Sequence, residues 1–246
     1  MVVDYRALNG ITIKEEYLLS RIHDMIDRLG KARWFSKLDL QSDHHQVEVS
    51  EAEQLKTDFR PRYGTFQFIV TPSGLAGAPS TFQRLMPNIL LQELDDSVMV
   101  YLDDVLVYSA TRQLHIHQLK NVSSNMREEL YVKLAKCEFC QQRVPYLGFV
   151  ISSEGIAADP AKLKTLRDWP EILNNTKQLR GFLGLVGYYR RLVPNFNKLA
   201  HPLHRLLKED SDMVWRMEHS EAVKNLKEAL INRPDSNCST QISLLS

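Results

Sequence analysis

The segment from Ser97 to Ser109 constrains the fold of this chain more than any other. Two strand-like runs, the alternating residues 98–102 and the apolar residues 105–108, meet at the adjacent carboxylates Asp103 and Asp104. Such runs, separated by a short break, are typical of a β-hairpin. Because neighbouring carboxylates repel each other unless something neutralises them, an acidic hairpin tip indicates either a solvent-exposed turn or a cation site.

A third carboxylate lies near the end of another predicted strand. Asp39 belongs to the short apolar segment 34–40, 64 residues before Asp103. If the two strands are neighbours, Asp39, Asp103 and Asp104 converge, and a divalent cation, best Mg²⁺, relieves their repulsion. Taken alone, two adjacent aspartates more often form an exposed turn, so that alternative stays open.

Composition indicates a globular chain. Its 246 residues suffice for one or two compact units, and 43% hydrophobic with 25% charged residues is ordinary for soluble domains. No apolar run reaches the roughly 20 residues of a membrane span, and no signal-peptide pattern opens the chain. We therefore expect no membrane partner and no secretion, but an intracellular, cytoplasmic location, which the odd count of three cysteines also favours.

Charge is unevenly distributed along the chain. The net charge is only +1, yet the segment from Pro160 to Lys208 contains ten Lys and Arg against two acidic residues. Such a region can follow a polyanion such as nucleic acid. A solvated basic helical face, balanced by acidic loops elsewhere, explains the same charges equally well.

Periodicity and turn residues predict an α+β fold with antiparallel strands in the first 155 residues. Before the acidic hairpin they predict a strand-like segment over 2–9, a helix over 18–29, strands over 34–40 and 46–49, and a hairpin turning near Gly64. A helix follows, which Ser80 caps and Pro87 kinks or shortens. After the acidic hairpin they predict a helix over 117–134 and a strand over 144–151.

The character of the sequence changes after Gly155. Asp159 and Pro160 predict a helix start, with the helix ending near Trp169. Further helices are predicted over 176–192 and 220–231, and prolines are expected to separate the helices. We expect a first domain over 1–155, a helical second domain over 156–234, and a disordered polar tail over 235–246.

Several short motifs in fixed order resemble one family. They are Val2–Asn9, Phe35–Leu40, Phe82–Met86, Tyr101–Asp104, Lys133–Phe139, Tyr146–Gly148, Phe182–Gly184 and Tyr189–Arg191. Together they resemble the reverse transcriptase of gypsy-like long-terminal-repeat retrotransposons, which is related to retroviral polymerases. The resemblance runs from Val2 to about Leu230, and an ordered series of this kind is far more specific than any single motif.

The resemblance implies a right-hand polymerase: partial fingers and palm over 1–155, then a helical thumb and the start of a connection. It implies an RNA-directed DNA polymerase, a nucleotidyltransferase that extends a primer 3′-end with dNTPs on an RNA or DNA template. Two Mg²⁺ ions, or Mn²⁺ in their place, are the implied cofactors. Neither template preference nor oligomeric state follows from it.

Site residues follow by position in the family pattern. The resemblance assigns metal binding and catalysis to Asp39, Asp103 and Asp104, nucleotide binding to Leu40, Asp43, His44, Ser73 and Gly74, the primer grip to Leu147, Gly148 and Phe149, and a template–primer track to Arg180, Gly184 and Tyr188.

The track residues share one helical face because they are spaced four apart. Glycine at Gly184 permits a sugar–phosphate backbone to approach closely. The competing interpretation is helix packing through Gly181, Gly184 and Gly187, since glycines also let helices approach one another.

The chain departs from the family pattern around the nucleotide. Asp43 and His44 stand where the family carries a glycine and an aromatic residue, Ser73 replaces an apolar residue, and Pro87 interrupts the helix behind the palm. The changes at Asp43 and His44 predict weaker nucleotide binding and poorer rejection of ribonucleotides. The basic finger residues and the ribonuclease H acids of the family fall outside the sequence, which resembles a truncated copy. The alternative function is therefore a catalytically impaired remnant that binds nucleic acid through its thumb.

A zinc site is a further alternative. His115, His117, Cys137 and Cys140 have spacings compatible with zinc ligands. Cys137 already belongs to the family pattern, however, and free thiols are the favoured interpretation.

Overall fold

The computed structural model describes residues 3–13, 21–40, 46–94, 96–127, 130–208 and 213–232. The predicted tail and the candidate residues Asp43 and His44 lie outside them. The chain divides into two compact units, Met1–Val144 and Pro145–Ser246. That division falls about ten residues before the domain boundary that we predicted near Gly155.

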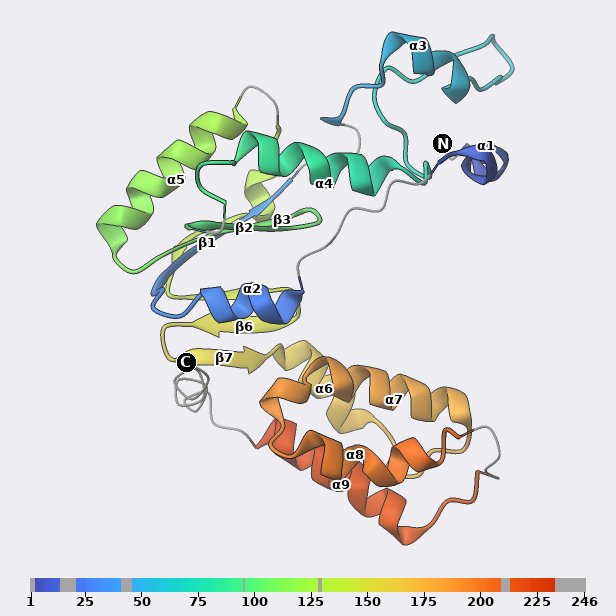
Figure 1. Cartoon of the computed structure of the whole chain (residues 1–246), viewed down its shortest axis with the longest axis vertical. Coiled ribbons are helices and arrows are strands. Elements are labelled where there is room, and N and C mark those ends of the chain that lie inside the picture. Colours follow the sequence, from blue (N-terminus) through green and yellow to red (C-terminus); the bar gives the residue numbers. More distant parts are fainter. Residues whose placement is uncertain are drawn as a thin grey trace. The chain divides into compact units, whose positions relative to one another are not determined.

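The first unit is built on an antiparallel sheet of four strands in the order β2-β3-β1-β4 (Figure 1). β2 spans Val98–Tyr101 and β3 spans Asp104–Ser109, so the predicted acidic hairpin is confirmed. β1 spans Trp34–Asp39 and pairs with β3 on one side and with β4, Glu138–Gln141, on the other. The two candidate acidic segments therefore belong to adjacent strands.

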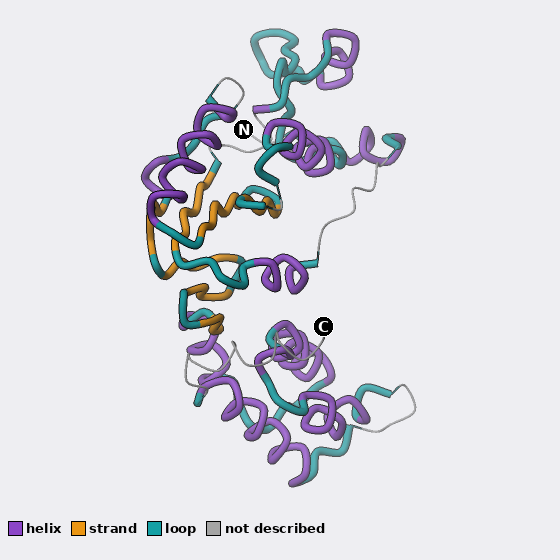
Figure 2. The backbone as a smooth tube through the Cα atoms, turned by 60° about the vertical axis from the view of Figure 1, so that its left-hand side comes forward, coloured by secondary structure: helices purple, strands orange, loops and turns teal. Residues whose placement is uncertain are grey.

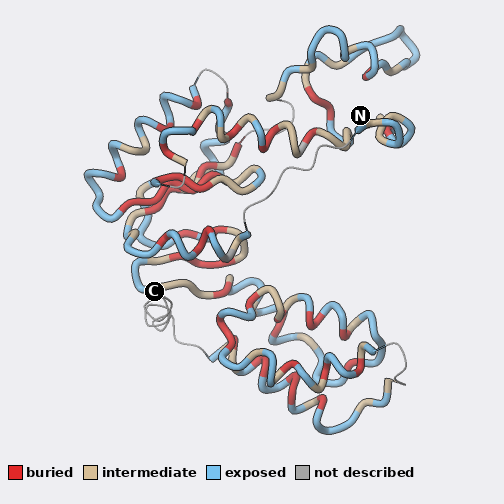
Figure 3. Tube along the Cα trace, viewed as in Figure 1, coloured by how far each residue is buried: buried red, intermediate tan, exposed pale blue. Residues whose placement is uncertain are grey.

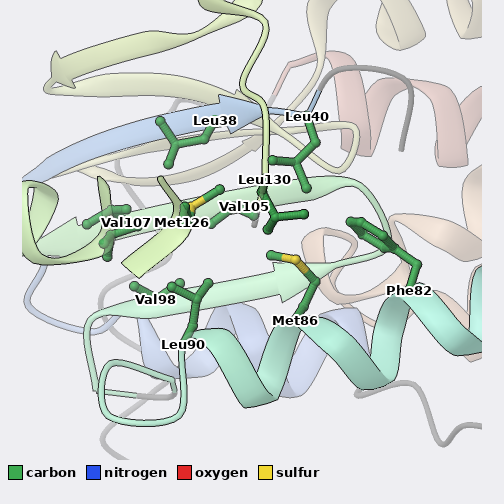
Figure 4. Packing of buried hydrophobic residues seen from close by; sticks show 11 residues of the cluster. Leu38, Leu40, Phe82, Met86, Leu90, Val98, Val105, Val107, Met126 and Leu130 are labelled. Carbon is green, nitrogen blue, oxygen red and sulfur yellow. The ribbon is translucent and has the colours of Figure 1, made fainter. Parts of the chain in front are cut away.

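Helices α4 (Ala78–Ile89) and α5 (Arg112–Met126) cover one face of this sheet (Figure 1). Figure 4 shows the apolar side chains of α4 directed at those of the strands, and Figure 3 shows the buried strands in red. The cluster consists of Leu38, Leu40, Phe82, Met86, Leu90, Val98, Val105, Val107, Val122, Met126 and Leu130. Because side chains alternate along a strand, Asp39 and Asp104 lie on the opposite face.

The start of α4 differs from the prediction. The helix begins at Ala78, and Ser80 does not cap it; its hydroxyl donates instead to the carbonyl of Gly77, at 3.0 Å. Pro87 lies inside the helix, which nevertheless continues to Ile89. The helix after the acidic hairpin also begins earlier than predicted, because Thr111 caps α5 by accepting from the amide of Leu114.

The remaining elements of the first unit are short. The strand predicted over 2–9 is wrong: α1 spans Arg6–Ile11 and starts where Asp4 accepts from the amide of Arg6. α2 spans Ile22–Arg28, α3 spans Glu51–Gln54, and the 3-10 turns η2 and η3 span Leu55–Thr57 and Leu134–Lys136. The predicted turn near Gly64 is confirmed by mutual backbone hydrogen bonds between Phe59 and Phe66. The strand predicted over 46–49 is reduced to a single bridge between Glu48 and Val70.

The second unit joins a small sheet to four helices and one 3-10 turn within its described residues (Figure 2). The sheet has the order β5-β6-β7, with strands Arg143–Tyr146, Phe149–Ser152 and Gly155–Ala158. The single strand predicted over 144–151 is thus a hairpin. The helices are α6 (Pro160–Asp168), α7 (Thr176–Tyr188), α8 (Phe196–Arg205) and α9 (Met217–Ile231), with η4 at Arg190–Leu192.

Two details of these helices test the predictions. Asp159 caps α6 as expected, because its carboxylate accepts from the amide of Ala161 at 2.8 Å. Helix α8 was missed, because Pro202, which was expected to lie between helices, lies inside it. α9 packs on α6 and α8, and α7 on α8; Leu179, Phe182 and Leu226 of these helices are fully buried. In the described part of the chain no helix is long and apolar enough to cross a membrane.

Candidate functional site

The tip of the acidic hairpin is a two-residue turn. Tyr101 at the end of β2 pairs with Asp104 at the start of β3, so the turn consists of Leu102 and Asp103. Leu102 has a left-handed backbone, with φ of 52°. A mirror-image turn of this kind follows the natural twist of two short antiparallel strands. The turn therefore presents Asp103 next to Asp104, at the end of two buried strands.

Asp39 faces this hairpin across the sheet. The last pair in the β1–β3 register is Asp39 with Asp104. Side chains of directly paired residues point to the same face, with Cβ atoms about 4.5–5.5 Å apart. The structure thus brings the first candidate aspartate beside the third, as the sequence predicted for neighbouring strands.

Two lysines, which the sequence reasoning missed, accompany these carboxylates. The ammonium of Lys37 lies 2.9 Å from Oδ1 of Asp104, and the ammonium of Lys136 lies 3.6 Å from Oδ1 of Asp39. They offset the repulsion expected between carboxylates directly opposite each other. Lys37 was detectable, because it lies two residues before Asp39 and shares its face of the strand. Lys136, in η3, lies in the Lys133–Phe139 motif, but its spacing to the aspartates gave it no role.

The donor set of these aspartates suits a divalent cation. Carboxylate oxygens are preferred ligands of Mg²⁺, which commonly takes one or two carboxylates and completes its shell with water and substrate phosphates. The side chains of Asp39 and Asp104 are partly exposed and so remain accessible. Among the described residues, however, no three His, Cys, Asp or Glu side chains form a group that could hold a metal by themselves.

The zinc alternative is wrong. His115 is fully buried, with Nε2 2.7 Å from the hydroxyl of Ser36 and Nδ1 2.9 Å from that of Ser109. Both ring nitrogens are therefore engaged. Burial lowers the pKa of His115, which favours the neutral ring. The Sγ of Cys137 accepts from the amide of Asp39 at 3.4 Å, and among the described residues no three His, Cys, Asp or Glu side chains form a metal-binding group.

The candidate nucleotide residues do not all lie together. Leu40 is buried within the apolar cluster of the sheet, so its side chain is directed into the core. Ser73 and Gly74 lie in an exposed turn, with Gly74 at a φ of 99°. The sequence reasoning missed Asn9, whose amide donates to the carbonyl of Gly74 and accepts from the amide of Ala76, both at 2.8 Å. A single side chain from α1 thus holds this loop.

A cavity of about 670 Å³ adjoins the same loop. Its mostly apolar lining comes from α1, from residues 48–57 and from the start of α4. None of the three candidate aspartates belongs to the described residues that line it. The cavity is therefore a separate feature from the acidic hairpin.

The candidate primer grip is the turn between β5 and β6. Leu147 and Gly148 form it, with φ values of 47° and 72°. The hydroxyl of Tyr188 donates to the carbonyl of Leu147 at 2.5 Å, and that of Tyr189 to the carbonyl of Gly148 at 2.7 Å. The ring of Phe149 stacks on Tyr188, with centroids 5.3 Å apart. Tyr189 was part of a recognised motif, but the sequence reasoning gave it no role.

The candidate track lies on α7. Arg180 and Gly184 are exposed, and Tyr188 is half-buried because its hydroxyl reaches the β5–β6 turn. The three residues thus share the helical face predicted from their spacing. Exposure leaves the first two accessible to a ligand.

The packing interpretation of the glycines holds for only one of them. A Cβ at Gly181 would lie 3.4 Å from two ring carbons of Trp169, so this glycine makes room for the indole. A Cβ at Gly184 or Gly187 would meet no described atom within 4 Å. Packing within the described residues therefore does not require glycine at Gly184.

Comparisons with known proteins find similar sequences and a similar fold. A family model described as reverse transcriptase (RNA-dependent DNA polymerase) matches residues 1–151. The retrovirus-related Pol polyprotein from transposon 297 of Drosophila melanogaster is 36% identical over 236 residues, which are 95% of this chain and 22% of the relative. The transposon Tf2-3 polyprotein of Schizosaccharomyces pombe is 34% identical over 235 residues and is covered to 18%. The chain thus spans about a fifth of these relatives.

Solved structures share the fold. The foamy viral protease-reverse transcriptase dRH in complex with double-stranded DNA matches 96% of this chain and 42% of its own, with a TM-score of 0.83 and 24% identity. The foamy viral protease-reverse transcriptase in complex with an RNA/DNA hybrid matches 96% of this chain and 32% of its own, with a TM-score of 0.78 and 24% identity. The predicted α+β class and the predicted resemblance are confirmed.

Proposed function

Because the chain belongs to the reverse transcriptase (RNA-dependent DNA polymerase) family, we propose that it carries the palm site for RNA-directed DNA synthesis. In this proposal Asp39, Asp103 and Asp104 hold two Mg²⁺ ions, or Mn²⁺ in their place, and a dNTP is joined to a primer 3′-hydroxyl on an RNA or DNA template. The first 155 residues supply fingers and palm, and residues 156–234 supply the thumb and the start of a connection.

The observation that carries this proposal is the pairing of Asp39 with Asp104 in register, beside a turn that contains Asp103. Asp39 and Asp104 thus lie side by side at one end of the sheet, and Asp103, which is 64 residues after Asp39 in the sequence, precedes Asp104 in the turn. In the structure Lys37 forms an ion pair with Asp104, and Lys136 forms one with Asp39. Bound Mg²⁺ would activate the attacking hydroxyl and stabilise the departing pyrophosphate.

Features of the second unit support the proposal that the chain binds a template–primer. Arg180 and Gly184 are exposed on α7, and ten basic residues between Pro160 and Lys208 offer a phosphate-binding charge. Solved relatives of the same fold are described with double-stranded DNA and with an RNA/DNA hybrid. These features also favour the second candidate function, a remnant that binds nucleic acid without extending it.

The predicted nucleotide-binding residues bear on the choice between dNTP and rNTP. Asp43 and His44 replace a glycine and an aromatic residue of the family pattern. A carboxylate there repels the triphosphate, and histidine is a smaller, polar barrier to the 2′-hydroxyl. We expect His44→Tyr to increase the preference for dNTP over rNTP, measured as the ratio of kcat/KM values. An unchanged ratio would contradict this role.

Primer extension on an RNA template tests the proposed function. The purified full chain is compared with Asp103→Asn and with Asp96→Asn, an exposed aspartate before β2 that serves as a matched control. We expect Mg²⁺-dependent extension that falls about a hundredfold or more in Asp103→Asn, since metal-assisted catalysis contributes several kcal/mol. Salt-sensitive binding without any Asp103-dependent extension would establish the remnant instead.

A further inference from the structure

The β5–β6 turn adopts a conformation that its sequence does not favour. Two-residue turns with positive φ at both positions prefer Asn-Gly, Asp-Gly or Gly-Gly. Here the first position is Leu147, at a φ of 47°. A leucine is strained in the left-handed region, because its Cβ crowds the backbone. The turn therefore depends on contacts from elsewhere in the second unit.

Those contacts come from the end of α7 and from the start of α6. Both turn carbonyls accept a tyrosine hydroxyl, Leu147 from Tyr188 and Gly148 from Tyr189. The carbonyl of Gly148 also accepts from the amide of Asp159, at 3.1 Å. Burial, with Tyr188 and Asp159 nearby, raises the pKa of Tyr189, so its hydroxyl stays a donor throughout the neutral range.

The aromatic rings enclose the same turn. The ring of Tyr189 meets Phe149 edge-on at 5.2 Å and Tyr188 edge-on at 5.0 Å. A Cβ at Gly148 would lie 3.3 Å from the hydroxyl of Tyr189 and 3.5 Å from the ring of Tyr188. Tyrosine hydroxyls therefore hold the carbonyls of the turn, and the tyrosine side chains pack against its glycine.

We propose that Tyr189 is a positioning residue for the primer strand, which together with Tyr188 clamps the grip turn to α7. Tyr189 is buried and does not itself present a surface to a ligand. Through the clamp, the turn and the exposed face of α7 with Arg180 and Gly184 form one rigid part. The primer end and the duplex behind it are therefore held in a constant register. This inference rests on the proposed function.

The test uses the full chain with Tyr189→Phe, Tyr188→Phe and, as a matched control, Tyr131→Phe, an exposed tyrosine of the first unit. Amide hydrogen exchange over 147–149 measures the clamp, and single-nucleotide extension measures kcat and the KM for dNTP. For Tyr189→Phe we expect faster exchange and a kcat about three- to tenfold lower, since one hydrogen bond is lost, with the dNTP KM unchanged. Melting should fall by a few degrees at most.

The outcomes separate this inference from the function on which it rests. Unchanged exchange, or faster exchange with unchanged kcat, would overturn the positioning role alone. If Tyr189→Phe does not fold, Tyr188→Phe, at the less buried of the two tyrosines, gives the same two measurements. A wild-type chain that extends no primer would overturn the proposed function and this role together, although the exchange data would still report whether the clamp exists.

Discussion

The hairpins β2–β3 and β5–β6 are alike in form but are held in different ways. Each has a two-residue turn whose first residue, Leu102 or Leu147, has a left-handed backbone. The acidic turn has its partners within its own sheet, where Asp104 faces Asp39 and pairs with Lys37. The grip turn is held by side chains of α7, 41 residues further along the chain.

This difference has a physical consequence. The β2–β3 hairpin belongs to a four-stranded sheet, so it keeps its position as long as the buried side chains of that sheet stay packed. A turn that is clamped by hydroxyls depends on a few directed contacts and on one glycine. The first should respond to core substitutions and the second to changes at the turn itself.

The largest effect is expected for the core of the acidic hairpin. Leu106 in β3 is fully buried, and Leu106→Ala should lower the free energy of unfolding by about 2–5 kcal/mol through lost contacts and a cavity. Urea unfolding measures this. Leu91→Ala, at an exposed leucine, is the control and should change stability by less than about 0.5 kcal/mol. Equal effects would contradict the dependence on the core.

The grip turn should respond to a single methyl group. Gly148→Ala adds a Cβ that lies 3.3 Å from the hydroxyl of Tyr189, on a residue whose φ is 72°. We expect this variant to lower the free energy of unfolding by about 1–2 kcal/mol. Thermal unfolding measures the change. Gly30→Ala is the control, because a Cβ there meets no described atom within 4 Å. If Gly148→Ala were neutral, the clamp would not constrain the turn.

Opposite changes in stability and binding are expected at Gly184. In an exposed helix position Gly184→Ala should raise stability by about 0.5–1 kcal/mol, because alanine loses less backbone entropy. If the helix face contacts a template–primer, the added methyl should weaken binding of a labelled duplex in fluorescence anisotropy. Stabilisation with unchanged affinity would leave Gly184 out of the track.

The smallest effect on stability at neutral pH is expected for His115, which bonds Ser36 of β1 and Ser109 of β3. Burial holds the pKa of His115 below its ordinary 6.5, so below pH 6.5 the unfolded chain binds a proton that the folded chain does not. Stability should therefore decrease as the pH falls through that range. His115→Gln should reduce this slope in urea unfolding, whereas His117→Gln, an exposed control, should preserve it.

Much of the acidic site was predictable because its signals are local. Alternation identified the strands around Asp103, and the family pattern identified Asp39. Lys37 was detectable from its spacing to Asp39. The strand predicted over 2–9 was wrong, since β-like residues alone did not reveal the turn that Asp4 makes with Arg6.

By itself the sequence determined which residues end the acidic strands and in which order the family motifs occur, because side-chain alternation and turn chemistry depend on near neighbours. Only the tertiary structure decided that Asp39 stands opposite Asp104, that Lys136 reaches the site, and that Tyr189 holds Gly148. Register and hydrogen bonds between distant residues depend on how whole elements pack, which no local pattern records.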